Sequence, residues 1–167
     1  EFCHVVTLQK TNNKMPRWLS EGISVYEEKQ ENAGWGQSMS AAYREIILAD
    51  GLTPVSQLSG AFLAPPSPLH LQFAYFESSL VVEYLVEHYG LETLKRILVD
   101  LSVGMPINES LQRYTGSLAL LDQEFEQFAR ARAESLAPGL DFSAQELPEQ
   151  QDAGSWNAWQ QAHPDNY

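Results

Sequence analysis

Near its N-terminus the chain carries the stretch from which the fold is best argued: Arg17-Trp18-Leu19-Ser20-Glu21-Gly22-Ile23-Ser24-Val25-Tyr26. Taken alone, it is typical of the start of a helix, with Ser20 as N-cap and Trp18 as a hydrophobic anchor. The preceding Pro16 biases its neighbour away from helical conformation. We therefore expect a connector at Pro16 and a helix from Glu21 to about Lys29.

The segment that precedes this stretch is Glu1-Phe2-Cys3-His4. A histidine in front of Glu1 would complete an H-E-x-x-H motif, in which two histidines on one helix face bind zinc and the glutamate acts as general base. Glu21 then stands at a suitable distance for the third ligand. A glutamate and a histidine three residues apart also occur by chance in many helices, so neither segment alone indicates a metal site.

Together with a third segment, these two resemble the gluzincins, the zinc metallopeptidases of peptidase clan MA, and among them the bacterial peptidase MA-like domains. Glu1-x-x-His4 is similar to the second half of the zinc helix. Trp18-Leu19-Ser20-Glu21-Gly22-x-x-x-Tyr26 is similar to the W-L-x-E-G-x-x-x-Y segment of the aminopeptidase N group. Tyr75-Phe76-Glu77-Ser78-Ser79-Leu80-Val81-Val82-Glu83-Tyr84-Leu85 resembles the helix whose first tyrosine stabilises the oxyanion in that group.

The resemblance implies a role for each matching residue. His4 and Glu21 would be zinc ligands together with the histidine that would precede Glu1, Glu1 would be the general base, and Tyr75 would be an oxyanion donor. Glu77-Ser78 replaces the usual Lys-Gly, and a core or interface position for Tyr75 is equally compatible with its helix. Because the chain starts after the first histidine, we expect zinc in the intact parent, and weak or absent zinc binding and no activity in these 167 residues alone.

Composition bounds the possible partners. The chain has 22 acidic and 10 basic residues, for a net charge of −12. Binding to nucleic-acid phosphates requires clustered Lys and Arg, so we expect no nucleic-acid partner. No apolar run approaches the roughly 18 residues of a membrane span. The single cysteine, Cys3, is predicted to be a small buried hydrophobe, and it leaves the compartment open, a bacterial envelope or extracytoplasmic location included.

The chain is predicted to be mainly α, as the helical C-terminal part of a gluzincin-like domain over residues 1–137. Hydrophobic residues recur at helical spacing between Gly and Pro breaks. The expected helices are 1–10, 21–29, 40–50, a short helix capped by Thr53, 71–89, 91–101, 107–114 and one from Ser117 to the break at Pro138. The expected connector 59–68 contains four prolines or glycines and is predicted to be non-helical.

Residues 138–155 are predicted to be a linker or an extended arm, because Pro, Gly, Gln and acidic residues dominate them. Residues 156–167 end in Ala-x-Pro-Asp-Asn and resemble the junction between tetratricopeptide repeats, which would bind a protein partner. His70, His88 and His163 lack metal-ligand spacing and are predicted to be structural.

The leading hypothesis is zinc-dependent peptide-bond hydrolysis by the intact parent. The alternative is a non-catalytic, peptidase-like scaffold that binds proteins. The residue before Glu1 discriminates between the two hypotheses.

Overall fold

The computed structural model describes residues 2–32, 34–136 and 161. All regular elements in these ranges are helices, which confirms the mainly α prediction. The elements are α1 (Phe2–Lys10), α2 (Arg17–Glu31), α3 (Ala41–Leu48), the 3-10 helix η1 (Val55–Gly60), α4 (Pro68–Tyr89), α5 (Leu91–Ser102), α6 (Ile107–Thr115) and α7 (Leu118–Glu134).

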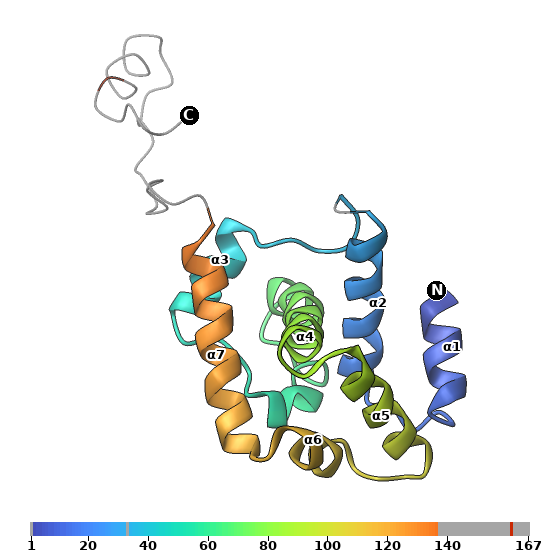
Figure 1. Cartoon of the computed structure of the whole chain (residues 1–167). Coiled ribbons are helices and arrows are strands. Elements are labelled where there is room, and N and C mark those ends of the chain that lie inside the picture. The colour runs from blue at the N-terminus through green and yellow to red at the C-terminus, as the bar shows by residue number, and fades with distance from the viewer. Residues whose placement is uncertain (1, 33, 137–160, 162–167) are drawn as a thin grey trace.

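Helix α4 is the centre of the domain, with the other helices arranged around it (Figure 1). Apolar residues occur on nearly all sides of α4, and a helix with this pattern must be covered on all sides. Phe73, Phe76, Val81 and Leu85 are among its fully or almost fully buried residues. Ser67 caps its first turn, and the left-handed conformation of Gly90 ends it at φ 81°.

The tightest packing in the domain is between α2 and α4. At Gly22 an added Cβ atom would lie 2.5 Å from the backbone oxygen of Ser78, which is well inside any tolerable contact. Only a residue without a side chain permits this approach. Trp18 and Leu19, on the same helix, are almost completely buried in the core.

Three predicted boundaries were wrong. Helix α2 begins at Arg17, directly after Pro16, so Ser20 lies inside the helix and is not its N-cap. The segment after Pro54 is a 3-10 helix that ends at Gly60, and its N-cap is Pro54, without a side-chain cap bond, rather than Thr53. Pro68, which was assigned to the connector, is the first residue of α4. Proline is well tolerated there because the N–H of the first helical residue has no hydrogen-bond partner within the helix.

The N-terminal helix α1 is more exposed than predicted. It packs antiparallel to α2, as expected (Figure 1). Leu8 packs against the core, but Val5 is 52% exposed and Phe2 is 81% exposed. Only one face of this helix is therefore buried by the part of the chain that the structure describes.

Of the remaining histidines, the structure describes His70 and His88. His70 lies in the first turn of α4, 2.8 Å from the Ser67 hydroxyl, and His88 stacks against Tyr84 with ring centroids 4.3 Å apart. Both positions are consistent with structural roles. His163, the predicted linker 138–155 and nearly all of the predicted repeat start 156–167 lie outside the described residues, and these assignments stay predictions.

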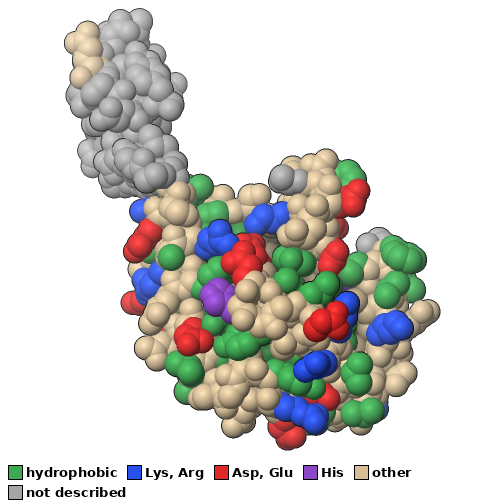
Figure 2. Space-filling view, in the orientation of Figure 1, with side chains coloured by type: hydrophobic (Ala, Val, Ile, Leu, Met, Phe, Trp, Pro, Cys, Tyr) green, Lys and Arg blue, Asp and Glu red, His purple; other side chains and the backbone are tan. Residues whose placement is uncertain are grey.

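Charged side chains of both signs are scattered among hydrophobic ones on the face shown in Figure 2. The helices of the described ranges are all too short or too polar to cross a membrane. Near the surface of the domain, Glu83 of α4 forms ion pairs with Lys29 of α2 at 3.1 Å and with Arg132 of α7 at 2.9 Å. One carboxylate thus connects three helices.

Glu77 is the exceptional acidic group, because its side chain is only 1% exposed. It lies on α4 and accepts a hydrogen bond of 2.6 Å from the backbone N–H of Thr53. Burial raises its pKa from 4.5 to about 8, although the bonds from Thr53 act in the opposite direction. The carboxyl group is therefore mostly protonated at neutral pH.

Substitution of Gly22 by alanine should destabilise the domain. Because the new Cβ would overlap the Ser78 carbonyl, α2 and α4 must separate, which we expect to cost about 1–3 kcal/mol of unfolding free energy. The matched control is Gly60→Ala, whose Cβ would enter open space and should change stability by less than about 1 kcal/mol. Denaturant titration of both variants gives the comparison, and equal midpoints would contradict the close-packing argument.

Glu77 should make the stability depend on pH. The folded protein retains a proton that the unfolded chain loses between about pH 4.5 and pH 8, so the free energy of unfolding falls as pH rises through this window. Glu77→Gln preserves an acceptor for Thr53 and should remove this component, so the variant gains on the wild type as pH rises. Denaturant midpoints at pH 5 and pH 8 measure the effect. The exposed Glu109→Gln serves as control, and a Glu77→Gln protein that retains the wild-type slope would refute the assignment.

Candidate active site

The two predicted zinc ligands lie side by side. His4, on α1, places its Nε2 atom 3.4 Å from Oε2 of Glu21, on α2. The side chains are 27% and 21% exposed, so the pair is partly shielded yet reachable from solvent. The antiparallel packing of α1 on α2 brings these residues together across sixteen intervening positions in the sequence (Figure 1).

The spacing of this pair fits a metal ion. Two donor atoms bound to one tetrahedral zinc at about 2.0–2.2 Å lie about 3.3–3.6 Å apart, which includes the observed 3.4 Å. A direct charge-assisted hydrogen bond between such groups is shorter, at about 2.7–2.9 Å. Neutral imidazole and carboxylate are also the donor types that zinc accepts. The structure does not describe Glu1. Among the residues that it does describe, no three or more His, Cys, Asp or Glu side chains form a group that could hold a metal ion.

Ser20 orients the His4 ring. Its Oγ atom is 2.8 Å from His4 Nδ1, the ring nitrogen that faces away from Glu21. A histidine that binds a metal commonly uses its other ring nitrogen in this way, which fixes the tautomer and the direction of the ring. Ser20 is buried within α2. It does not cap the helix, as the sequence suggested, and its hydroxyl contacts His4 instead.

Tyr75 is connected to this pair through Arg17, which the sequence reasoning missed. Arg17 Nε donates to Glu21 Oε1 at 3.4 Å, and its Nη2 donates to the Tyr75 hydroxyl at 2.8 Å. The only sequence signal for the first contact is the spacing of four residues between Arg17 and Glu21, which places both on one helix face. Nothing in the sequence pattern indicates the second contact, because 58 positions separate the two residues.

Tyr75, the candidate donor, and Tyr84, which also lies on α4, have different environments. Tyr75 is half-buried, and its ring packs edge-on against Phe62 at 5.2 Å between centroids. Tyr84 is 2% exposed and donates a 3.0 Å hydrogen bond to Glu124 of α7. Burial raises the pKa of the Tyr84 hydroxyl, which stays a neutral donor within the core. Of the two, Tyr75 is the one connected to the His4–Glu21 pair.

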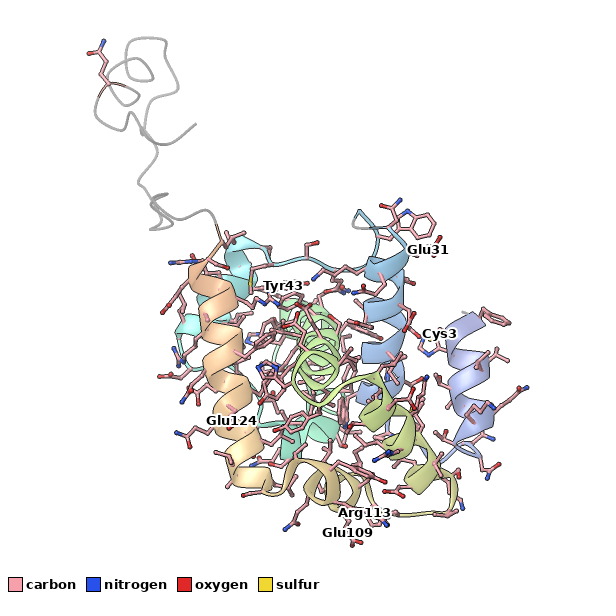
Figure 3. All side chains as sticks on the ribbon, in the orientation of Figure 1. Cys3, Glu31, Tyr43, Glu109, Arg113 and Glu124 are labelled. Atoms are coloured by element: carbon pink, nitrogen blue, oxygen red, sulfur yellow. The ribbon has the colours of Figure 1, made fainter. Side chains whose placement is uncertain are left out.

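Cys3 lies on the side of α1 that faces α2 (Figure 3). It is half-buried rather than fully buried, and it lines a groove with Ser24 and Glu27 of α2. Burial raises the pKa of its thiol. Among the described residues, Cys3 does not join His4 and Glu21 in a group of three potential metal ligands.

The model of the peptidase MA superfamily matches residues 1–131, and the chain therefore belongs to that superfamily. Membership makes it a peptidase-type domain, from a superfamily that generally depends on zinc and with peptides or proteins as the broad substrate class. No curated protein and no solved structure gives a significant match.

Proposed function

We propose that this chain is part of a gluzincin-type, zinc-dependent peptidase. The observation that carries the proposal is the 3.4 Å separation between His4 Nε2 and Glu21 Oε2, two donors of the correct chemical types on different helices. Each residue also has a polar partner on its other atom, which is the usual environment of a metal ligand. The proposed third protein ligand is a histidine directly before Glu1, on the same helix face as His4.

The proposed chemistry divides among the residues as follows. Zinc, when bound, lowers the pKa of a coordinated water to about 7 and so supplies a nucleophile at neutral pH. Glu1 accepts a proton from the attacking water and later gives it to the leaving amine. Tyr75 donates a hydrogen bond to the oxygen of the scissile carbonyl as negative charge develops on it.

A non-catalytic scaffold is the alternative. The same His4–Glu21 contact, with no metal, would act as an ion pair that holds α1 against α2. Such a partly exposed pair contributes about 0–1 kcal/mol, so this structural role is small. The alternative predicts that both residues tolerate substitution without any loss beyond stability.

Zinc binding should depend on the residue that precedes Glu1. The 167-residue chain supplies two proposed side-chain ligands and a mostly protonated α-amino group, whose ordinary pKa is about 7.7–8.0, so we expect weak binding or none. The same chain with one added N-terminal histidine should bind one zinc, as measured by calorimetry at pH 7. His4→Ala and Glu21→Ala should abolish this binding, whereas the control His88→Ala should retain it. Micromolar binding by the unextended chain, lost on His4→Ala, would contradict the three-ligand site.

Tyr75→Phe in the full-length protein should lower turnover by about 10²-fold while substrate affinity changes little. The phenol is proposed to meet the oxyanion only as the transition state forms, so its removal acts on kcat rather than on KM. Glu1→Gln should be more damaging, because proton transfer then lacks its base. Neither variant should lose zinc. Tyr114→Phe is the control, because each of the two tyrosine rings lies beneath an arginine. The central guanidinium carbon of Arg113 is 5.7 Å from the ring centroid of Tyr114, and that of Arg17 is 5.9 Å from the ring centroid of Tyr75. Wild-type turnover in Tyr75→Phe would remove Tyr75 from the mechanism.

A further inference from the structure

Arg17 occupies the position between the proposed metal ligand and the proposed oxyanion donor. One guanidinium reaches Glu21 on its own helix and Tyr75 on α4. Two different N–H groups make these contacts: Nε–H donates to Glu21, and an N–H of Nη2 donates to Tyr75. Arginine alone among the side chains presents such a rigid set of donors.

The contact with Arg17 gives the two carboxylate oxygens of Glu21 different partners. Oε1 accepts from Arg17, whereas Oε2 faces His4 Nε2. With Oε1 occupied, the carboxylate is held in the rotation that presents Oε2 toward the His4 side. A partner on the outer oxygen of a carboxylate ligand is a recurrent means of fixing metal geometry.

The contact with Tyr75 determines where the phenol proton can point. A guanidinium has donors only, so the Tyr75 oxygen must be the acceptor in this 2.8 Å bond. The phenol proton is therefore directed away from Arg17 and is available to another acceptor. This is the arrangement required of a residue that donates to a substrate oxygen.

Aromatic rings hold the guanidinium in place. Its central carbon lies 5.2 Å from the centroid of Phe62 and 5.9 Å from that of Tyr75. Phe62 is itself buried and packs edge-on against Tyr75. The hydrogen bonds to Tyr75 and Glu21 raise the pKa of Arg17, and an arginine side chain stays charged in proteins in any case. Because 58% of the Arg17 side chain is exposed, these contacts add little to stability.

We propose that Arg17 is a positioning residue that couples the Glu21 carboxylate to the Tyr75 phenol, fixing the metal ligand and the oxyanion donor relative to each other. The inference rests on the proposed function. It differs from an ordinary surface ion pair in one respect: a pair would serve Glu21 alone, whereas the proposed bridge serves two groups with separate tasks. The loss of Arg17 should therefore have two separable effects.

Arg17→Met in the full-length zinc-loaded protein is the first test. Chelator competition should show zinc binding weakened by about 10–100-fold, the usual result of removing the partner of a metal ligand. The matched control is Arg113→Met on α6 (Figure 3), because Arg113 is 57% exposed, pairs with Asp100 at 3.1 Å and lies 5.7 Å from the ring of Tyr114. Arg113→Met should leave zinc affinity unchanged, although it costs some thermal stability.

The second test separates the phenol from the metal ligand. At saturating zinc, Arg17→Met should lower kcat in the wild-type background but have little further effect in a Tyr75→Phe background, because the two residues act on one donor. Its effect on zinc affinity should be the same in both backgrounds. Arg17→Lys should recover at most one of the two losses, because an ammonium group lacks the rigid fork of donors.

The outcomes distinguish the inference from the function on which it rests. If the wild-type protein holds no zinc and hydrolyses no peptide, the proposed function fails. If the wild type is active and Arg17→Met matches Arg113→Met in zinc affinity and kcat, only the inference fails. Full recovery of both properties by Arg17→Lys would also overturn it, since charge alone would then suffice.

Discussion

The close approach of α2 and α4 at Gly22 is the constraint on which the rest of the domain depends. A backbone oxygen of α4 occupies the space that a Gly22 side chain would need. From this point the contacts run in the same order along both helices, from Arg17–Tyr75 through Gly22–Ser78 to Lys29–Glu83. Because protein interiors are packed to the density of crystals, no other residue at Gly22 would preserve this register.

The candidate site is a consequence of that register. Glu21 directly precedes Gly22, so the residue that brings the helices together also determines where the carboxylate points. His4 comes from α1 on one side of α2, and Tyr75 comes from α4 on another (Figure 1). Arg17 and Ser20, both on α2, connect the two. Helix α2 therefore positions functional groups that come from three helices. In this way a small helical domain, with no sheet in its described part, can hold the side chains of a site rigidly.

Two acidic residues of α4 show how the surroundings of a carboxyl group determine its properties. Burial raises the pKa of Glu77, which accepts a hydrogen bond from Thr53, whereas Glu83, only six residues later, is paired with Lys29 and Arg132. The difference lies in exposure and in partners, since Glu83 is 15% exposed and pairs with two cations, whereas Glu77 is 1% exposed and accepts from a neutral backbone N–H. Desolvation penalises the ionised form of a buried carboxyl unless a partner compensates for it. The local environment of a carboxylate, and not its residue type, thus decides whether it carries charge.

The sequence by itself determined the helical class and most helix spans, because periodicity is a local property, and its resemblance to gluzincin segments offered His4, Glu21 and Tyr75 as candidates. It could not determine that Ser20 turns toward His4, that Glu77 is buried, or that Arg17 reaches across to Tyr75. These contacts join residues 16, 24 and 58 positions apart, and their partners are known only once α1, α2 and α4 are packed. Tertiary structure decided them, since a side chain's hydrogen bonds follow from its neighbours in space rather than in sequence.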